Sequence, residues 1–237
     1  MRSGHLALLL FVALLPGCAG PGPGVGNAVA PGAAQVVLDP VSSPQWAADM
    51  AGFAAQDVRQ PPPAHPVVFT GSSSVRMWTT LAADFPRQPV LNRGFGGSQL
   101  RDAVWYADQV AVRYQPRRIV LYAGDNDIDA GRTPGQVRDD FRAFVARIRR
   151  DLPDVPIAWL AIKPSLARID QLPAQQRANV LVRAEAARMR DVHFIDVATP
   201  MLGVDGRPRP ELFLEDGLHM NRKGYELWRG IVAPYLR

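Results

Sequence analysis

The sequence predicts an α/β fold, a three-layer α/β/α sandwich with a central parallel sheet of about five strands. Five short apolar segments are nearly continuous, as expected of strands covered on both faces. Segments with helical periodicity alternate with them, and a helix that links two parallel strands must cross over a face of the sheet. The content of 47% hydrophobic and 21% charged residues fits one globular domain with a sizeable core.

The first predicted element is a short helix over residues 44–57, because Trp46, Met50 and Phe53 recur at helical spacing. The segment QPPPAHP then interrupts regular structure and introduces the first strand. The predicted strands are residues 66–70, 89–92, 118–122, 156–162 and 192–197.

Three further helices are predicted between or after these strands. One opens at Ser98 and carries Leu100, Val104 and Ala107. The clearest begins at Thr133 and Pro134, an N-cap and a first-turn proline. Its apolar stripe consists of Val137, Phe141, Phe144 and Ile148. The last helix covers about residues 221–236.

The N-terminus has the features of an export signal. Arg2 supplies a positive charge, and residues 6–15 form an apolar core that is too short to span a bilayer. The only cysteine, Cys18, follows in the sequence LLPGCAG, which resembles the bacterial lipobox. That resemblance implies acylation of Cys18, and ordinary cleavage after residues 28–30 (AVA) is the alternative.

We therefore expect three parts in the chain: a signal peptide at residues 1–17, a flexible tether rich in Gly, Pro and Ala at residues 18–43, and one domain at residues 44–237. The expected location is the bacterial cell envelope, with a lipid anchor on Cys18 that faces the periplasm, or else a soluble periplasmic or secreted form. A lone cysteine excludes an intramolecular disulfide and a cysteine-based zinc site.

The formal net charge of +5 comes from scattered arginines and does not form a basic face interleaved with aromatic residues. Nucleic acid is therefore not an expected partner.

Four polar segments lie where a site is expected. Ligands of open α/β sheets bind beyond the carboxyl ends of the strands. Residues 71–74 (GSSS), 92–98 (NRGFGGS) and 122–127 (YAGDND) follow the first three predicted strands, and residues 215–221 (EDGLHMN) precede the last helix.

These segments, in this order, resemble the sequence blocks of the SGNH or GDSL hydrolases, which are esterases and lipases with a flavodoxin-like sheet. The resemblance extends over residues 67–223. It implies that Ser73 is the nucleophile and that its backbone N–H, that of Gly97 and the side chain of Asn126 form the oxyanion hole. The DGLH block supplies Asp216 and His219, which complete a catalytic triad.

The residues themselves are consistent with these roles. A serine hydroxyl needs a neighbouring base, and histidine has a suitable pKa. His5 lies in the signal, His65 precedes the first strand and His193 falls within a strand pattern, which leaves His219. Asp216 is three residues earlier and can hold the imidazole Nδ1–H.

Each residue also has a simpler interpretation. Ser73 could be a helix N-cap, Asn126 and Gly97 could be turn residues, and Asp216 could belong to a plain turn. Four such coincidences in the family's order are harder to accept than one site.

The chain departs from the family pattern at two positions. Ser72 replaces the aspartate of the GDS block, which places the supporting hydrogen bonds of that block in question. Ser98 stands where the family often has an aspartate, and we expect it to cap the following helix, with Ser74 an ordinary first-turn residue.

The predicted function is hydrolysis of carboxylic esters through an acyl-enzyme intermediate, with no metal or cofactor. Acetyl esters of glycans and longer acyl esters of lysophospholipids are both compatible substrates. Candidate residues for the substrate mouth are Arg93, Phe95 and Lys163. Two alternatives are an inactive binding lipoprotein on the same scaffold and a flavodoxin-type electron carrier, although the carrier leaves Asp216 and His219 unexplained.

Overall fold

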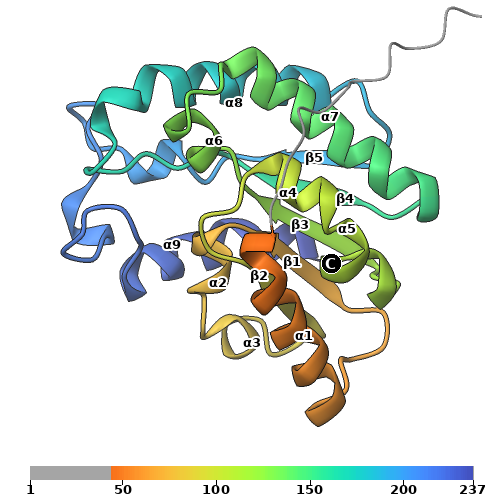
Figure 1. Cartoon of the computed structure of the whole chain (residues 1–237). Coiled ribbons are helices and arrows are strands. Elements are labelled where there is room, and N and C mark those ends of the chain that lie inside the picture. The colour runs from red at the N-terminus through yellow and green to blue at the C-terminus, as the bar shows by residue number, and fades with distance from the viewer. Residues whose placement is uncertain (1–43, 237) are drawn as a thin grey trace, which may run out of the picture. The chain divides into compact units, whose positions relative to one another are not determined.

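The computed structural model describes residues 44–236, and in this part of the chain five parallel strands form one sheet in the order β2-β1-β3-β4-β5. The strands are β1 (Val67–Gly71), β2 (Val90–Gly94), β3 (Arg118–Tyr122), β4 (Ile157–Leu160) and β5 (Val192–Ile195). Helices lie on both faces of the sheet (Figure 1), which confirms the predicted fold class.

The helices connect the strands as expected of a parallel sheet. They are α1 (Ala47–Arg59), α2 (Ser73–Arg76), α3 (Leu81–Asp84), α4 (Leu100–Trp105), α5 (Ala107–Val110), α6 (Asp125–Asp129), α7 (Pro134–Asp151), α8 (Leu172–Ala186) and α9 (Arg222–Val232). None of the helices within residues 44–236 is both long enough and apolar enough to cross a membrane.

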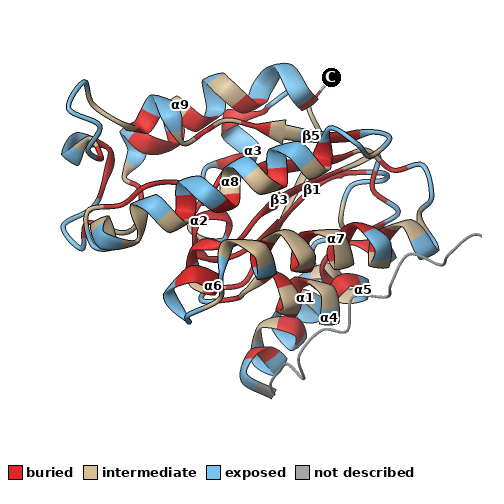
Figure 2. Cartoon of the chain, turned by 90° about the horizontal axis from the view of Figure 1, so that it is seen from above, coloured by how far each residue is buried: buried red, intermediate tan, exposed pale blue. Residues whose placement is uncertain are grey.

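Two hydrophobic cores lie on opposite faces of the sheet. The core against α1, α4, α5, α7 and α8 receives alternate residues of β3, Ile119 and Leu121, while Val120 and Tyr122 enter the core against α2, α3 and α9. Figure 2 shows the buried strands running between helices whose outer faces are exposed. Because side chains of a strand alternate in direction, one short apolar strand contributes to both cores.

Helix α7 follows the sequence prediction most closely. Its predicted apolar stripe is buried, and the Thr133 side chain accepts a hydrogen bond from the Gln136 N–H at 3.3 Å. The first predicted helix is also present, as a 3-10 turn (Pro44–Trp46) followed by α1, which ends at Arg59 instead of residue 57, and Met50 is buried in the core.

Further helical boundaries differ from the prediction. The helix expected from Ser98 begins at Leu100, with Gln99 at the N-cap, and it is divided into α4 and α5 at Tyr106. The last α-helix, α9, ends at Val232 and continues as a 3-10 turn. The expectation that Ser98 caps a helix is wrong, because its hydroxyl is buried without a hydrogen-bond partner in the described part of the chain.

Helix α8 was not predicted from the sequence. Its buried residues are Gln175, Ala178, Val182 and Ala186, a stripe dominated by small side chains. Such a stripe gives a weak hydrophobic periodicity even where it packs closely.

The sheet order places a topological switch point between β1 and β3. From β1 the chain moves to β2 on one side and then crosses to β3 on the other. Ligand sites of doubly wound sheets form at such a point, beyond the carboxyl ends of the strands. Segments that follow β1, β2 and β3 therefore meet there.

Candidate active site

Ser73 is the first residue of α2, directly beyond β1. Gly71 has φ +118°, and a Cβ at this position would lie 1.8 Å from the carbonyl oxygen of Tyr122 in β3. The same carbonyl accepts the N–H of Ser72 at 2.9 Å. The sharp turn from strand to helix thus depends on glycine, and it places Ser73 just beyond the carboxyl end of β1.

The backbone N–H of Ser73 has no acceptor among the described residues, as expected of the first helical position. The Ser73 side chain is largely buried, with the whole residue 8% exposed. A hydroxyl and a backbone donor of the same residue therefore lie together at the start of a helix.

His219 and Asp216 approach Ser73 from the loop before α9. The Ser73 Oγ lies 3.1 Å from His219 Nε2, and His219 Nδ1 lies 2.6 Å from Asp216 Oδ2. With the Nδ1–H donated to the carboxylate, Nε2 carries the lone pair that can accept the serine proton. The three side chains are connected in the order required for transfer of that proton.

The Asp216 carboxylate is held in its ionised form. Its Oδ1 accepts the backbone N–H groups of Leu218 and His219, each at 2.9 Å. Burial alone would raise the pKa of Asp216, but these bonds and the bond from the imidazole prevail and lower it to about 2. The carboxylate is therefore ionised near neutral pH and can orient the imidazole.

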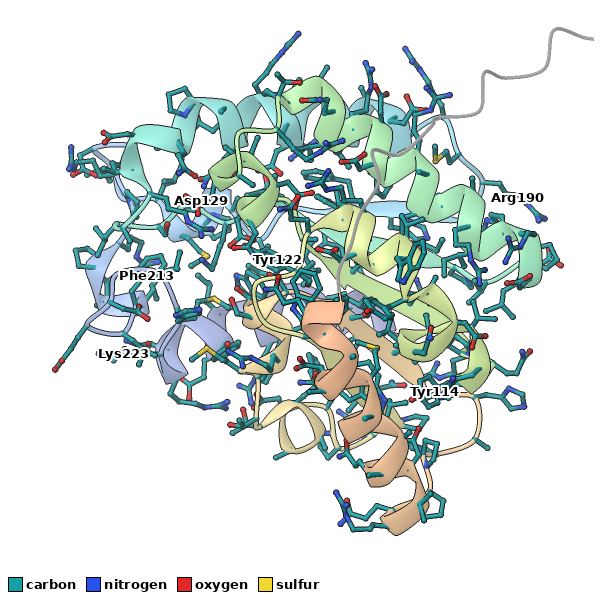
Figure 3. All side chains as sticks on the ribbon, viewed as in Figure 1. Tyr114, Tyr122, Asp129, Arg190, Phe213 and Lys223 are labelled. Carbon is teal, nitrogen blue, oxygen red and sulfur yellow. The ribbon has the colours of Figure 1, made fainter. Side chains whose placement is uncertain are left out.

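The loop that carries Asp216 and His219 is fixed at both ends. The N–H of Leu214 donates to the carbonyl of His219 at 2.8 Å, and Phe213 pairs with Met220 in an antiparallel bridge. Asn221 caps α9, with its Oδ1 accepting the N–H of Gly224 at 3.2 Å. Phe213 and Lys223 lie on one side of the molecule in Figure 3, away from Arg190.

Asn126 lies in α6, just beyond β3. Its Nδ2 donates to the carbonyl of Ser98 at 3.0 Å, and its Oδ1 accepts from the Arg168 guanidinium at 3.1 Å. One N–H of the amide is used by Ser98, and the second is available to another acceptor.

Gly97 lies in the loop after β2. It has φ +80°, and a Cβ there would have no other part of the described chain within 4 Å, its two sequence neighbours aside. Its N–H has no acceptor within residues 44–236. The space beside this backbone is open, as access of a substrate would require.

Asp127, next to Asn126, connects the start of α4 with the turn that follows β3. Its Oδ1 accepts the N–H of Leu100 at 3.0 Å and its Oδ2 accepts the N–H of Gly124 at 2.9 Å. Burial raises the pKa of this carboxyl to about 7 despite the two donors. No role was predicted for Asp127, although its place in the GDND segment was a signal.

The structure does not place Arg93, Phe95 or Lys163 at a substrate mouth. All three side chains are buried, with exposed fractions of 1%, 0% and 1%. The Arg93 guanidinium binds Asp57 and the Tyr114 hydroxyl beneath α1. The sequence expectation is wrong because Arg93 lies within β2, and because side chains just past a strand end, such as those of Phe95 and Lys163, can point inward as readily as outward.

Cys18 lies outside the residues that the structure describes. No role was predicted for Arg168. The signal for Arg168 was its place shortly after a strand, in the segment KPSLAR. Within residues 44–236, no group of three or more His, Cys, Asp or Glu residues is arranged to hold a metal ion.

Comparison with known proteins finds a matching family model and several solved structures with a similar fold. The model of the GDSL-like Lipase/Acylhydrolase family matches residues 52–227. No curated protein matches the chain. A GDSL-like lipase from Bacteroides thetaiotaomicron is 18% identical with a TM-score of 0.67, and the match covers 80% of this chain and 97% of that one.

Two further solved structures have the same fold. A carbohydrate esterase family 3 protein from Talaromyces cellulolyticus is 16% identical with a TM-score of 0.60, covering 72% of this chain and 95% of that one. A lipase/acylhydrolase from Enterococcus faecalis is 19% identical with a TM-score of 0.57, covering 71% and 93%. At these identities the likeness shows the fold alone.

Proposed function

Because the chain belongs to the GDSL-like lipase/acylhydrolase family, we propose that it is a serine esterase that hydrolyses carboxylic esters through an acyl-enzyme intermediate. In this proposal Ser73 is the nucleophile, His219 the general base and Asp216 the residue that orients His219. The observation that carries it is the hydrogen-bonded series from Ser73 Oγ through the imidazole to the Asp216 carboxylate.

Acylation begins when His219 Nε2 takes the proton of the Ser73 hydroxyl as Oγ attacks the ester carbonyl carbon. The carbonyl π electrons move to oxygen and form an oxyanion. The donors proposed for this oxyanion are the N–H groups of Ser73 and Gly97 and the second N–H of Asn126. When the tetrahedral intermediate collapses, His219 gives its proton to the departing alcohol.

Deacylation repeats the same steps with water. His219 takes a proton from the water molecule whose oxygen attacks the acyl-enzyme, and the same donors stabilise the second oxyanion. Collapse breaks the bond to Ser73 Oγ, which recovers the proton from His219, and a carboxylic acid leaves. The cycle needs no group beyond the triad, the donors and water.

Labelling with a fluorophosphonate probe tests the nucleophile, since such probes react with activated serines. We expect the wild-type protein to be labelled at Ser73 and the Ser73→Ala variant to be neither labelled nor active on p-nitrophenyl acetate. Ser74→Ala is the matched control, because it removes the adjacent buried hydroxyl of the same helix and should leave labelling intact. An unlabelled wild-type protein would instead support an inactive binding lipoprotein.

The preferred acyl length decides between the two substrate classes. A panel of p-nitrophenyl esters from acetate to palmitate, assayed on protein that lacks its first 18 residues, separates a short acetyl pocket from a long acyl groove. A maximum of kcat/KM at acetate favours acetylated glycans, whereas a maximum at long chains favours lysophospholipids.

We also propose that Cys18 carries a lipid anchor that holds the domain at the cell envelope. The support is the position of this cysteine directly after an apolar signal segment. Metabolic labelling with an alkyne-bearing palmitate should modify the wild-type chain and leave Cys18→Ser unlabelled. Equal labelling of both would reject the anchor and favour cleavage after residue 30.

A further inference from the structure

The segment after β4, residues 163–168 (KPSLAR), contacts both halves of the site. One half is the loop with Asp216 and His219, and the other is Asn126. The proposed chemistry gives this segment no role, yet both of its cations and one of its backbone N–H groups make these contacts.

Lys163 binds the loop with the base. Its Nζ donates to the carbonyl of Leu218 at 2.7 Å, between Asp216 and His219 in sequence. The side chain is buried, with its Nζ 5.8 Å from the centre of the Phe213 ring. A buried ammonium is costly unless it is hydrogen-bonded, so a movement of the loop that broke this contact would be unfavourable.

The same segment touches the loop at a second point. The N–H of Ala167 donates to the carbonyl of Gly217 at 3.0 Å. Gly217 has φ +60°, and a Cβ there would lie 3.0 Å from the Cβ of Leu166. Two successive carbonyls of the loop, those of Gly217 and Leu218, are therefore held by the 163–168 segment.

Arg168 binds the other half of the site. Its Nη1 donates to Asn126 Oδ1 at 3.1 Å and lies 3.5 Å from Asp125 Oδ2, while its Nη2 donates to Asp129 Oδ2 at 2.9 Å. Gln171 holds the other oxygen of Asp129 at 2.7 Å. The side chain of Arg168 is only 13% exposed. Figure 3 shows Asp129 on the same side of the molecule as Phe213.

This contact determines whether the Asn126 amide presents its NH₂ group or its oxygen to the proposed oxyanion. Arg168 has only donors, so it fixes Oδ1 of Asn126 toward itself and directs Nδ2 toward the Ser98 carbonyl and the site. A flipped amide would offer an oxygen to the oxyanion and repel it. A cation on the carbonyl also polarises the amide and strengthens its N–H as a donor.

We propose that Arg168 and Lys163 are positioning residues that set the two halves of the site in register, Arg168 by fixing the donor amide of Asn126 and Lys163 by fixing the loop with His219. The inference rests on the proposed esterase function.

The Arg168 half is tested with Arg168→Met and Arg168→Lys on p-nitrophenyl acetate. Loss of an oxyanion donor costs about 10²- to 10³-fold in kcat, so partial misplacement should lower kcat by about 10- to 100-fold with KM little changed. Lysine retains a cationic donor group and should restore part of the rate. Arg183→Met is the control, because Arg183 pairs with Asp196 on the surface of α8 and should leave kcat unchanged.

A double-mutant comparison shows whether Arg168 acts by positioning Asn126 or only by stabilising the surrounding structure. If Arg168 acts through Asn126, Arg168→Met should lower kcat less than about twofold in an Asn126→Ala background, because coupled residues are not additive. An equal loss in both backgrounds overturns the proposal.

The Lys163 half is tested with Lys163→Met, and with Lys163→Gln should the first variant fail to fold. Assayed at a temperature where the variant is fully folded, kcat should fall about tenfold, since a small misplacement of reacting groups reduces the rate strongly. A wild-type kcat in a folded variant overturns this half.

Proton and nitrogen NMR gives readouts that do not depend on activity. Arg168→Met should shift the side-chain amide resonances of Asn126, and Lys163→Met should shift the Nδ1–H resonance of His219. If both stay at their wild-type positions, the proposal is wrong whatever the activity. A wild-type protein without esterase activity would refute the proposed function alone.

Discussion

The Oγ of Ser72 lies 3.5 Å from Oδ1 of Asp125, and both side chains are buried beneath the turn that carries Ser73. Ser72 stands where the GDS block of the family has an aspartate. In this chain the carboxylate of Asp125 in α6 lies beside the Ser72 hydroxyl, and Arg168 lies 3.5 Å from its other oxygen. The hydroxyl and the carboxylate thus form one hydrogen-bonded pair between two blocks.

Ser72→Asp should therefore destabilise this protein, although it restores the family residue. It would bring two buried carboxylates together with one nearby arginine, and an uncompensated buried charge costs about 3 kcal/mol or more. The double variant Ser72→Asp, Asp125→Ser exchanges the two groups and should recover most of the loss. Urea unfolding measures all three proteins, and a double variant no more stable than Ser72→Asp would contradict the pairing.

The strands and the site order could be predicted from the sequence because both depend on local patterns. Strands buried on two faces appear as short apolar runs, and the segments with Asn126 and His219 retain the residues that define their blocks, while the Ser73 segment lacks only the aspartate that Ser72 replaces. The orientation of Arg93 and Lys163 could not be predicted, since it depends on which neighbouring element offers an acceptor. Helix α8 was missed because alanines form much of its buried face.

Asp216→Asn should lower kcat by about 10³- to 10⁴-fold, as loss of the orienting carboxylate does in serine proteases. Oδ1 of Asp216 accepts two backbone N–H groups, so an asparagine would keep its oxygen there and turn its NH₂ toward His219 Nδ1. The imidazole would then carry its proton on Nε2 and could not take one from Ser73. Steady-state kinetics measures the effect.

The matched control for this variant is Asp205→Asn. Asp205 accepts a backbone N–H in an exposed turn, as Asp216 does, but it touches no histidine. Its kcat should equal that of the wild type. An Asp216→Asn enzyme with wild-type kcat would show that the carboxylate does not select the tautomer.

Gly71 and Gly97 should respond differently to substitution by alanine. Gly71→Ala should prevent folding or cost several kcal/mol, because its Cβ would lie 1.8 Å from the Tyr122 carbonyl oxygen. Gly97→Ala should fold, since nothing lies within 4 Å of its Cβ. Its left-handed backbone costs about 1 to 2 kcal/mol with alanine. Thermal melting and kcat/KM measure both.

The folded Gly97→Ala variant should have a lower kcat/KM than the wild type, for a reason separate from its lower free energy of unfolding. The methyl group would enter the open space beside the Gly97 N–H, and a displaced donor should lower kcat/KM by about 10- to 100-fold. Unchanged kcat/KM would remove Gly97 from the proposed oxyanion hole.

The stability of the fold should fall between about pH 4 and pH 7 through Asp127. Burial raises the pKa of its carboxyl from 3.8 in the unfolded chain to about 7 in the folded protein. The folded state therefore holds a proton that the unfolded state has lost, and the free energy of unfolding decreases as the pH rises through this range. The loss for one such group is at most about 4 kcal/mol.

Asp127→Asn isolates this contribution because an amide does not titrate. Asparagine keeps one acceptor for Leu100 or Gly124 but turns its NH₂ toward the other N–H, so the variant should be less stable than the wild type at pH 4.5. The difference in the free energy of unfolding between the two proteins should narrow by pH 7.5, where the wild type must bury a charge. Urea unfolding of both proteins across this range measures it. A constant difference would mean that Asp127 is ionised in the folded protein throughout, with its two N–H donors outweighing burial.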